Sequence, residues 1–246
     1  MRALTALTLG LLLLPVGCKN VRVASGSDDK FIHTPRELNA PPPPLEKTLF
    51  PTTIGSKWVY RLAEGETGQE TIMVTGTRQI DGTKAIVLSS KRVGQPDREE
   101  LYEITEEQIK QLSAGGQDKV TLKPPMPLIQ APLAFDAVVS WQGGVAMRGS
   151  LVPSTSKSRL RSVEQVVVPA GTYTTYRVDT NLEAQLKEGP ARFWTTRWFA
   201  PGIGPVKIRY IVSAPGQPDH AFMKELVSCD IKPLPVLPAR GLYELR

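Results

Sequence analysis

Apolar and polar residues alternate along most of the chain, from about Leu49 onward. In the segments 57–62 (KWVYRL) and 206–212 (VKIRYIV), every second side chain is large and apolar, and those between are mostly charged. Successive side chains of a strand point to opposite faces, so this period of two predicts strands that bury one face. Turn residues separate such segments at short intervals, which is typical of antiparallel sheets.

Glycine-containing turns link the predicted strands. Asp81-Gly82 stands between two β-like segments, and both residue types tolerate the positive φ values of a type I′ hairpin. Residues 169–171 (Pro-Ala-Gly) have a comparable place between the β-like segments 162–168 and 172–180. The chain is therefore expected to run as a series of hairpins.

Two regions depart from the strand pattern. TEEQIKQLSA at 105–114 is compatible with a helix capped by Thr105, but Ile104, Ile109 and Leu112 do not form a convincing helical face. A strand-turn-strand interpretation is therefore favoured. Prolines then predict an irregular crossing before Trp141, because proline lacks the backbone donor that a sheet interior needs. They are Pro124, Pro125, Pro127 and Pro132.

Some segments are apolar on both faces, for example 86–88 (IVL) and 166–168 (VVV). Such a sheet is expected to curl and close, because closure removes unpaired edges. We therefore predict an all-β protein with a single antiparallel β-domain over 47–232, whose strongly curved sheet forms a barrel or half-barrel. Few or no helices are expected apart from a signal peptide.

The chain begins with MRALTALTLGLLLLPVGC, in which Arg2 precedes an apolar run that ends at Gly17-Cys18. The run is shorter than the roughly 20 residues that a spanning helix needs, so residues 1–17 are predicted to be a signal peptide. They resemble a bacterial lipoprotein signal cut before Cys18, although Pro15 stands where that pattern has Leu, Val or Ile. The alternative is an ordinary secretory signal, in which Cys18 is incidental.

A lipid on Cys18 would anchor the mature protein in a membrane of the bacterial cell envelope. Lys19, which is not aspartate, resembles the sorting rule for the outer membrane. Residues 18–46 have no sustained periodicity and include four prolines at 41–44, so they are expected to form a tether. Residues 233–246 are expected to form an extended tail, which either packs on the domain or presents a surface to a partner.

The chain is mildly basic, with 30 Lys and Arg against 24 Asp and Glu. Removing Arg2 with residues 1–17 leaves a net charge of +5. The tightest basic cluster is Lys157, Arg159 and Arg161, whose period of two places it on one solvent-exposed strand face. No nucleic-acid partner is therefore predicted.

The chain has two cysteines, Cys18 and Cys229. If Cys18 carries lipid, Cys229 has no intramolecular partner, and no disulfide framework supports the fold. Cys229 is then expected to be a buried, unreactive thiol. An intermolecular disulfide or a reactive thiol is the alternative.

The sequence contains no recognisable catalytic or metal-binding motif. Its two histidines, His33 and His220, lack neighbours at the spacing of a zinc site or a catalytic triad. We therefore predict no metal, no cofactor and no enzymatic activity; for a hydrolase, the weakest class, the first candidates are Glu103, Glu106 and Asp179. An acidic cluster is expected to be a solvated edge, and its members are Asp97, Glu99, Glu100, Glu103, Glu106 and Glu107.

Three segments together resemble a group of uncharacterised bacterial lipoproteins and periplasmic proteins related to the DUF3108 and TapB2-like families. They are LFPTTIGSKWVYRL at 49–62, VVVPAGTYTTYRV at 166–178 and WFAPGIGPVKIRY at 198–210. Thr52 departs from the first motif, which usually has leucine there. The resemblance covers about 49–230 and implies an envelope β-domain whose shared motifs are structural.

The leading hypothesis is a non-enzymatic, membrane-anchored envelope lipoprotein that acts as a binding or assembly module for another envelope protein. The alternative is a carrier or sensor for an apolar ligand, a lipid or acyl chain, inside the barrel. A module would have its interior filled, whereas a carrier would keep a void of a few hundred Å³. The candidate cavity or structural residues are Trp58, Trp141, Trp194, Trp198, Pro201, Gly202 and Gly204.

Overall fold

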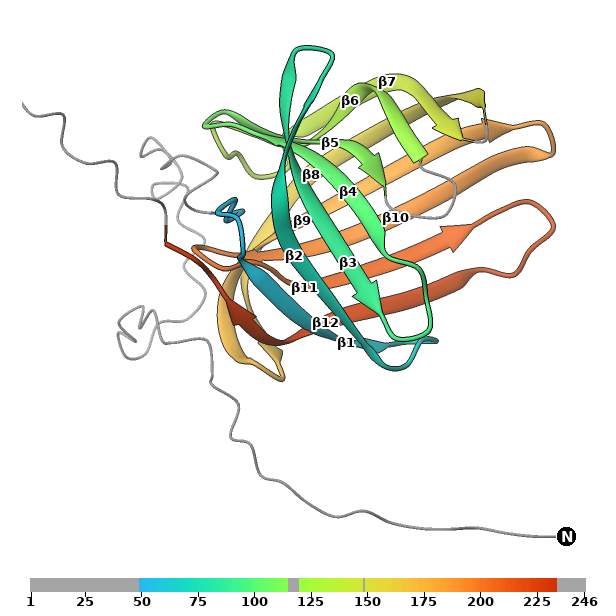
Figure 1. The fold of residues 1–246 in the computed structure, drawn as a ribbon. Helices are drawn as coiled ribbons and strands as arrows, with labels where there is room; N and C mark the ends of the chain where they lie inside the picture. The colour runs from blue at the N-terminus through green and yellow to red at the C-terminus, as the bar shows by residue number, and fades with distance from the viewer. Residues whose placement is uncertain (1–48, 115–119, 148, 234–246) are drawn as a thin grey trace, which may run out of the picture.

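The computed structural model describes residues 49–114, 120–147 and 149–233, and these form a closed barrel of twelve strands (Figure 1). The predicted all-β class and closed antiparallel sheet are confirmed. Within the described ranges, no helix has the length and apolar character needed to cross a membrane. The strands are β1 (Lys57–Ala63), β2 (Gln69–Ile80), β3 (Thr83–Arg92), β4 (Arg98–Ile104), β5 (Gln108–Ala114), β6 (Val120–Gln130), β7 (Val138–Met147), β8 (Ser150–Val168), β9 (Gly171–Leu186), β10 (Gly189–Ala200), β11 (Gly204–Ser213) and β12 (His220–Asp230).

Each strand pairs antiparallel with its neighbours in sequence, and β1 pairs with β12 to close the barrel. Register shifts interrupt several ladders, for example between Val59 and Tyr60 and between Trp198 and Phe199. Such bulges increase the local twist and bend of a strand, which a closed sheet requires.

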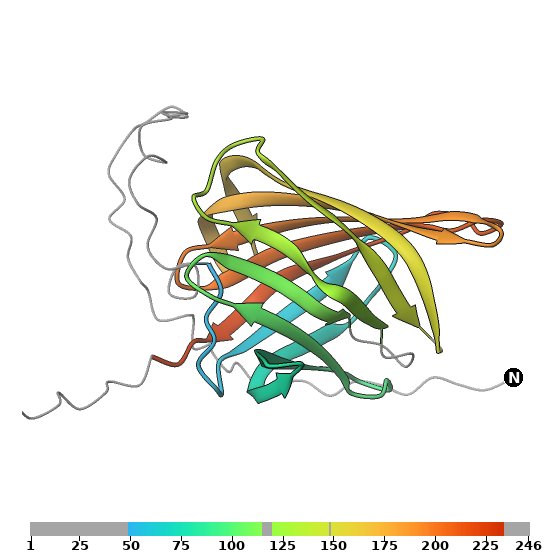
Figure 2. The ribbon, with the colours of Figure 1, turned by 90° about the horizontal axis from the view of Figure 1, so that it is seen from above.

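The two ends of the barrel differ. Residues 49–56 enter β1 and residues 231–233 leave β12 at one end, which we call the closed end (Figure 1). Strands β1, β3, β5, β7, β9 and β11 finish at the other, which we call the open end. Figure 2 shows the long hairpin of β9 and β10, in orange, projecting at this open end.

Aromatic side chains fill the closed end. Phe50, which precedes β1 and is 5% exposed, packs against Trp58, Tyr102 and Phe199, with ring centroids 5.4 to 6.4 Å apart. The indole Nε1 of Trp58 donates to the carbonyl of Ile203 at 2.6 Å. Burial of such large rings is the main stabilising contribution at this end.

The predicted turns are confirmed by their backbone geometry. Asp81 and Gly82, between β2 and β3, have φ values of 49° and 80°. Gly204 has φ +96°, and a Cβ there would lie 3.4 Å from Cδ of Pro51 and 3.6 Å from the Trp58 ring. Glycine at 204 therefore lets the entering chain pack closely against the start of β11.

The strand-turn-strand interpretation of 98–114 is confirmed, because β4 and β5 form a hairpin there. Thr105 does not cap a helix. Its Oγ1 instead accepts the backbone N–H groups of Glu107 and Gln108 at 3.2 Å, which stabilises the turn.

The expected irregular crossing at the prolines is wrong for Pro124, Pro125 and Pro127, which lie within β6. This strand pairs with β5 through two register shifts, but it pairs with β7 only over Thr121–Lys123. Proline adopts extended φ values but cannot donate to a ladder, so the chain stays a strand while its second edge is left mostly unpaired. The irregular segment is confined to residues 131–137.

The predicted signal peptide, the tether with Cys18 and residues 234–246 of the tail lie outside the described residues. Cys229 lies on β12, half-buried against the core, and is disulfide-bonded. The expectation of a free thiol at Cys229 is therefore wrong. A cysteine sulfur that carries a thioether-linked lipid cannot also form a disulfide. If Cys18 is lipidated, the disulfide of Cys229 must therefore join it to a cysteine of another chain.

Candidate ligand-binding site

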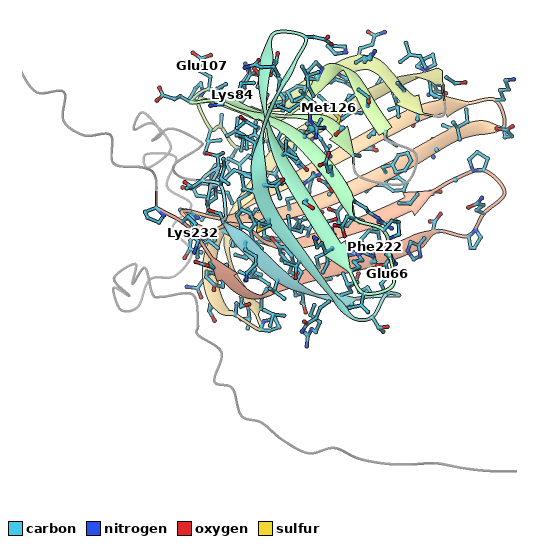
Figure 3. All side chains as sticks on the ribbon, viewed as in Figure 1. Glu66, Lys84, Glu107, Met126, Phe222 and Lys232 are labelled. Carbon is cyan, nitrogen blue, oxygen red and sulfur yellow. The ribbon has the colours of Figure 1, made fainter. Side chains whose placement is uncertain are left out.

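A cavity of about 370 Å³ occupies the open half of the barrel. It is lined by inward-facing residues near the strand ends opposite to the aromatic core, such as Phe193 of β10, Val212 of β11 and Phe222 of β12. Figure 3 labels Phe222 and Glu66 at this end, and Lys232 at the opposite, closed end. The barrel interior is thus filled at one end and hollow at the other.

One wall of the cavity is apolar. Ala184 and Ala191 are paired neighbours on β9 and β10, and both are almost fully buried although their side chains are small. Because small side chains on facing strands leave space that larger ones would fill, these positions help to keep the cavity open. The apolar wall consists of Ala114, Val120, Leu122, Met126, Val145, Val152, Leu182, Ala184, Leu186, Ala191 and Phe193.

The opposite wall carries buried charges. The carboxylate of Glu70 on β2 lies 2.9 Å from Nζ of Lys224 on β12 and 2.9 Å from Nη2 of Arg92 on β3. Glu70 is 2% exposed and Lys224 is 4% exposed. Arg92 also pairs with Glu66, which lies nearer to the mouth. Two cations therefore share one fully buried carboxylate.

The charge network keeps these groups ionised. Burial by itself would raise the pKa of Glu70, but Lys224 and Arg92 outweigh it and hold the pKa below the usual 4.5. Burial by itself would lower the pKa of Lys224, but Tyr210, Glu70 and Glu100 raise it above the usual 10.5. The wall therefore presents fixed charges across the whole neutral range.

Arg197 on β10 also faces the cavity and is 7% exposed. Its Nη1 atom is buried and has no hydrogen-bond partner. Glu100 lines the cavity too, and its carboxylate accepts a hydrogen bond from the Tyr102 hydroxyl at 2.6 Å. Burial and then the nearby Glu100 carboxylate raise the pKa of Tyr102 well above 10, so its hydroxyl remains a donor.

The four tryptophans that the sequence suggested as cavity residues lie in different environments in the structure. Trp194 lies beside the cavity, but its side chain shares the outer face of β10 with Trp198, because it alternates with the inward-facing Phe193. Trp58 and Trp141 are buried in the core, where Trp141 donates to the carbonyl of Pro124 at 3.0 Å. Trp198 points to the outer face, because its neighbour Arg197 faces inward; its indole donates to Glu164 and lies under Arg177 and Lys207.

Pro201 and Gly202 lie in the loop that connects β10 to β11 at the closed end, and Gly204 is the first residue of β11. It lies beside Pro51 and Trp58 and is not part of the cavity wall. The hypothesis that this loop rims a ligand cavity therefore does not apply to the cavity at the open end.

The hydrolase candidates do not come together. Glu103 pairs with Lys110 at 3.2 Å, Glu106 is exposed in the turn after β4, and Asp179 lies on the outer face of β9 with Arg177. Among the residues that the structure describes, no group of three His, Cys, Asp or Glu side chains could hold a metal ion. The prediction that the acidic cluster is a solvated edge is wrong for Glu100. The alternation of β4 directs the Glu100 side chain inward, where it lines the cavity.

The charged residues of the cavity were missed by the sequence interpretation, although strand parity marks them. Lys224 stands between Phe222 and Leu226 on the inward face of β12, and Arg197 stands two residues before the buried Phe199 on β10. The hydrophobic pattern marks the inward face of both strands, so a charged residue at an inward position was the available signal.

Solved structures of two bacterial proteins are similar to the chain. One is a protein from Bacteroides fragilis, assigned as exported and with a YmcC-like fold, which has 13% identity, a TM-score of 0.50, and a match covering 75% of this chain and 99% of that one. At this level of identity, the similarity to the Bacteroides fragilis protein concerns the fold alone. A protein from Parabacteroides distasonis assigned as a lipoprotein has 13% identity, a TM-score of 0.48, and a match covering 74% and 99% of the two chains. No family model and no curated protein matches the chain.

Proposed function

We propose that the protein is a lipid-anchored protein of the bacterial cell envelope that binds an amphipathic ligand inside its barrel, as a carrier or sensor and not as an enzyme. The observation that carries the proposal is the cavity of about 370 Å³, with an apolar wall facing a wall of buried charges. An assembly module would not need a hollow interior. The cavity therefore favours ligand binding over the assembly hypothesis.

The size and lining of the cavity fit a small amphiphile. A water molecule occupies about 30 Å³ in the liquid, so 370 Å³ holds roughly a dozen groups of methylene size. Burying each methylene contributes about 0.8 kcal/mol, which is enough for a chain of this length to bind from dilute solution. The ligand we propose is a single acyl or alkyl chain with a polar end.

The position of the anchor supports access to this cavity. The described chain begins with Leu49 at the closed end, so a lipid on Cys18 would tether the barrel by that end (Figure 1). A flexible chain of about 30 residues spans roughly 30 Å, which lets the domain stand away from the membrane. The mouth at the open end would then be accessible to a ligand in the periplasm.

The envelope location rests on the signal sequence and agrees with the assignment of the Bacteroides fragilis neighbour as exported. Lys19 favours the outer membrane. Intact-mass measurement of protein extracted from its native membrane tests the anchor: we expect an N-terminus at Cys18 with the added mass of a diacylglyceryl group and a third acyl chain. An unlipidated chain with a Cys18–Cys229 disulfide would refute the anchor.

Native mass spectrometry tests the ligand. The chain is exported with Cys18→Ser, which removes the lipid acceptor, and is purified without detergent. We expect an added species of lipid mass that survives purification and is released on denaturation. A bare monomer that also fails to take up added dodecanol would refute the proposal and leave the assembly module as the hypothesis to pursue.

A cavity-filling variant locates the bound species. Ala184→Phe places a ring where the wall is lined by a methyl group, so the bound mass should be lost while the barrel still folds. Val167→Phe is the matched control, because Val167 is 73% exposed on the outside of β8. Retention of the ligand by Ala184→Phe would place the binding site outside this cavity.

A further inference from the structure

We infer that the ligand of this cavity carries an acidic headgroup, a carboxylate or a phosphate, and that Arg197 binds that headgroup at the cavity floor. The inference rests on the proposed function and deepens it, because it names the chemical class of the ligand and the direction in which it enters. It stands on three observations: the state of Arg197, the balance of charge around it, and the layout of the apolar wall.

Arg197 is a buried cation whose guanidinium is incompletely satisfied. The residue is 7% exposed and lines the cavity, and its Nη1 has no hydrogen-bond partner. Phe199, two residues further along β10, is fully buried in the aromatic core, so Arg197 stands at the boundary between core and cavity. A buried guanidinium nitrogen without a partner is costly, and a bound anion that accepted a hydrogen bond from it would remove that cost.

The residues around Arg197 leave positive charge in excess. Four cationic side chains line the cavity but only two carboxylates do; the cations are Arg92, Arg98, Arg197 and Lys224, and the carboxylates are Glu70 and Glu100. Glu70 is already shared by Arg92 and Lys224. Glu66 near the mouth also pairs with Arg92, so four cations face three carboxylates in all. A second guanidinium, that of Arg98, also has a buried Nε without a partner. The cavity therefore favours an anion over a neutral or cationic group.

The shape of the donor selects the anion. A guanidinium presents parallel N–H donors that match the two oxygens of a carboxylate or phosphate, and such charge-assisted pairs are about twice as strong as neutral hydrogen bonds. The Thr180 side chain is buried in the same lining, where it bonds to Ser158 at 3.0 Å. Thr180 therefore adds one neutral polar group to this lining, which also contains the carboxylate of Glu100.

The apolar wall fixes the orientation of the ligand. From the level of Arg197 toward the mouth, the inward positions of β9 and β10 are apolar apart from Thr180 and Thr195, and Phe193 at the rim is 36% exposed. An alkyl chain can lie along this wall with its head at the floor. The ligand therefore enters head first, and its chain end lies near the open end of the barrel.

The test compares headgroups on one alkyl chain. Dodecanoate, dodecyl phosphate, dodecanol and dodecyltrimethylammonium are titrated into the Cys18→Ser protein at micromolar concentrations, and binding is followed by isothermal titration calorimetry. We expect the two anions to bind at least tenfold more tightly than dodecanol, and the cation to bind most weakly. The relative affinities of carboxylate and phosphate then distinguish a fatty acid from a phospholipid-type head.

Arg197→Gln tests the residue. The anions should lose about ten- to a hundredfold in affinity, whereas dodecanol should bind as before. Arg197→Lys should keep part of the preference for anions. Arg192→Gln is the matched control, because Arg192 lies on the same strand with its side chain on the outer face, paired with Glu183 at 2.9 Å.

The outcomes separate the inference from the proposed function. If dodecanol binds as tightly as dodecanoate, or if Arg197→Gln keeps the preference for anions, the inference is wrong while the ligand-binding function stands. If none of the four probes binds, the proposed function fails and the inference fails with it. The comparison of headgroups on the unsubstituted protein remains decisive even if Arg197→Gln does not fold.

Discussion

Replacing Glu70 by glutamine removes the carboxylate that Lys224 and Arg92 share on the charged wall of the cavity. The substitution keeps the size of the side chain and its ability to form hydrogen bonds. It leaves the ammonium of Lys224, which is 4% exposed, without an opposite charge at contact distance. We expect Glu70→Gln to be among the most destabilising polar substitutions in the protein.

The magnitude follows from the geometry. Two unit charges at 2.9 Å attract by about 6 kcal/mol at an effective dielectric constant near 20, and desolvation offsets part of this. Measured losses from breaking one side of a buried pair are about 3 to 5 kcal/mol. For a domain of this size that corresponds to a fall of roughly 6 to 20 °C in Tm. A total stability of about 5 to 15 kcal/mol would lose a large fraction.

Urea unfolding followed by tryptophan fluorescence measures the loss, because the core residue Trp58 becomes exposed on unfolding. Glu99→Gln is the control, since Glu99 and its partner Arg78 are each about half exposed and such pairs contribute at most about 1 kcal/mol. Adding Lys224→Met to Glu70→Gln should recover at least about 1 kcal/mol, because the stranded cation is then gone.

A loss below about 1 kcal/mol for Glu70→Gln would refute the reasoning. It would mean that water or movement of the Lys224 side chain compensates the missing carboxylate, so that the wall does not hold fixed charges. Absence of any recovery in the double variant would point instead to a packing defect at position 70. Either result would also remove the charge argument for an anionic ligand.

Two further predictions concern pH and the closed end. The folded-state pKa of Glu70 is lowered from 4.5, so its stabilising contribution is present above pH 4.5 and is lost as the pH falls through the folded-state pKa. Urea unfolding between pH 7 and pH 3 should therefore show a smaller acid-induced loss of unfolding free energy in Glu70→Gln than in the unsubstituted protein. Equal losses would contradict the assignment. Gly204→Ala should lower the free energy of unfolding by about 1 to 3 kcal/mol, because φ is +96° and the new Cβ would contact Pro51. Gly76→Ala is the control: a Cβ there has open space, so stability should change by less than about 0.5 kcal/mol. Equal effects of the two substitutions in thermal unfolding would contradict this account.

The strands and their buried faces could be predicted from the sequence wherever alternation is regular. Val206, Ile208 and Tyr210 face inward as their spacing indicates, and the positive φ values of Asp81 and Gly82 follow from residue type. These features depend on a few neighbouring residues. The proline-rich β6 was missed, because its strand conformation depends on pairing with β5, which is a contact between segments.

The candidate site could be predicted only in part. A barrel with a void was one of two alternatives, but the tryptophans named for it lie in the core or on the outer face of β10. Glu70, Glu100, Arg197 and Lys224 come from four different strands, and their proximity depends on register. A shift of one residue in any ladder would move that side chain to the opposite face. No pattern within a single strand specifies this register.

The sequence by itself determined the class of structure, because alternation, turn residues and the lack of helical periodicity act over short stretches of chain. It also determined which side chains of each regular strand turn inward, since successive side chains of a strand point in opposite directions. Only the tertiary structure decided which end of the barrel is filled and which is hollow. That outcome depends on where Leu49 and Phe50 pack, and on charges from distant strands that meet across the interior.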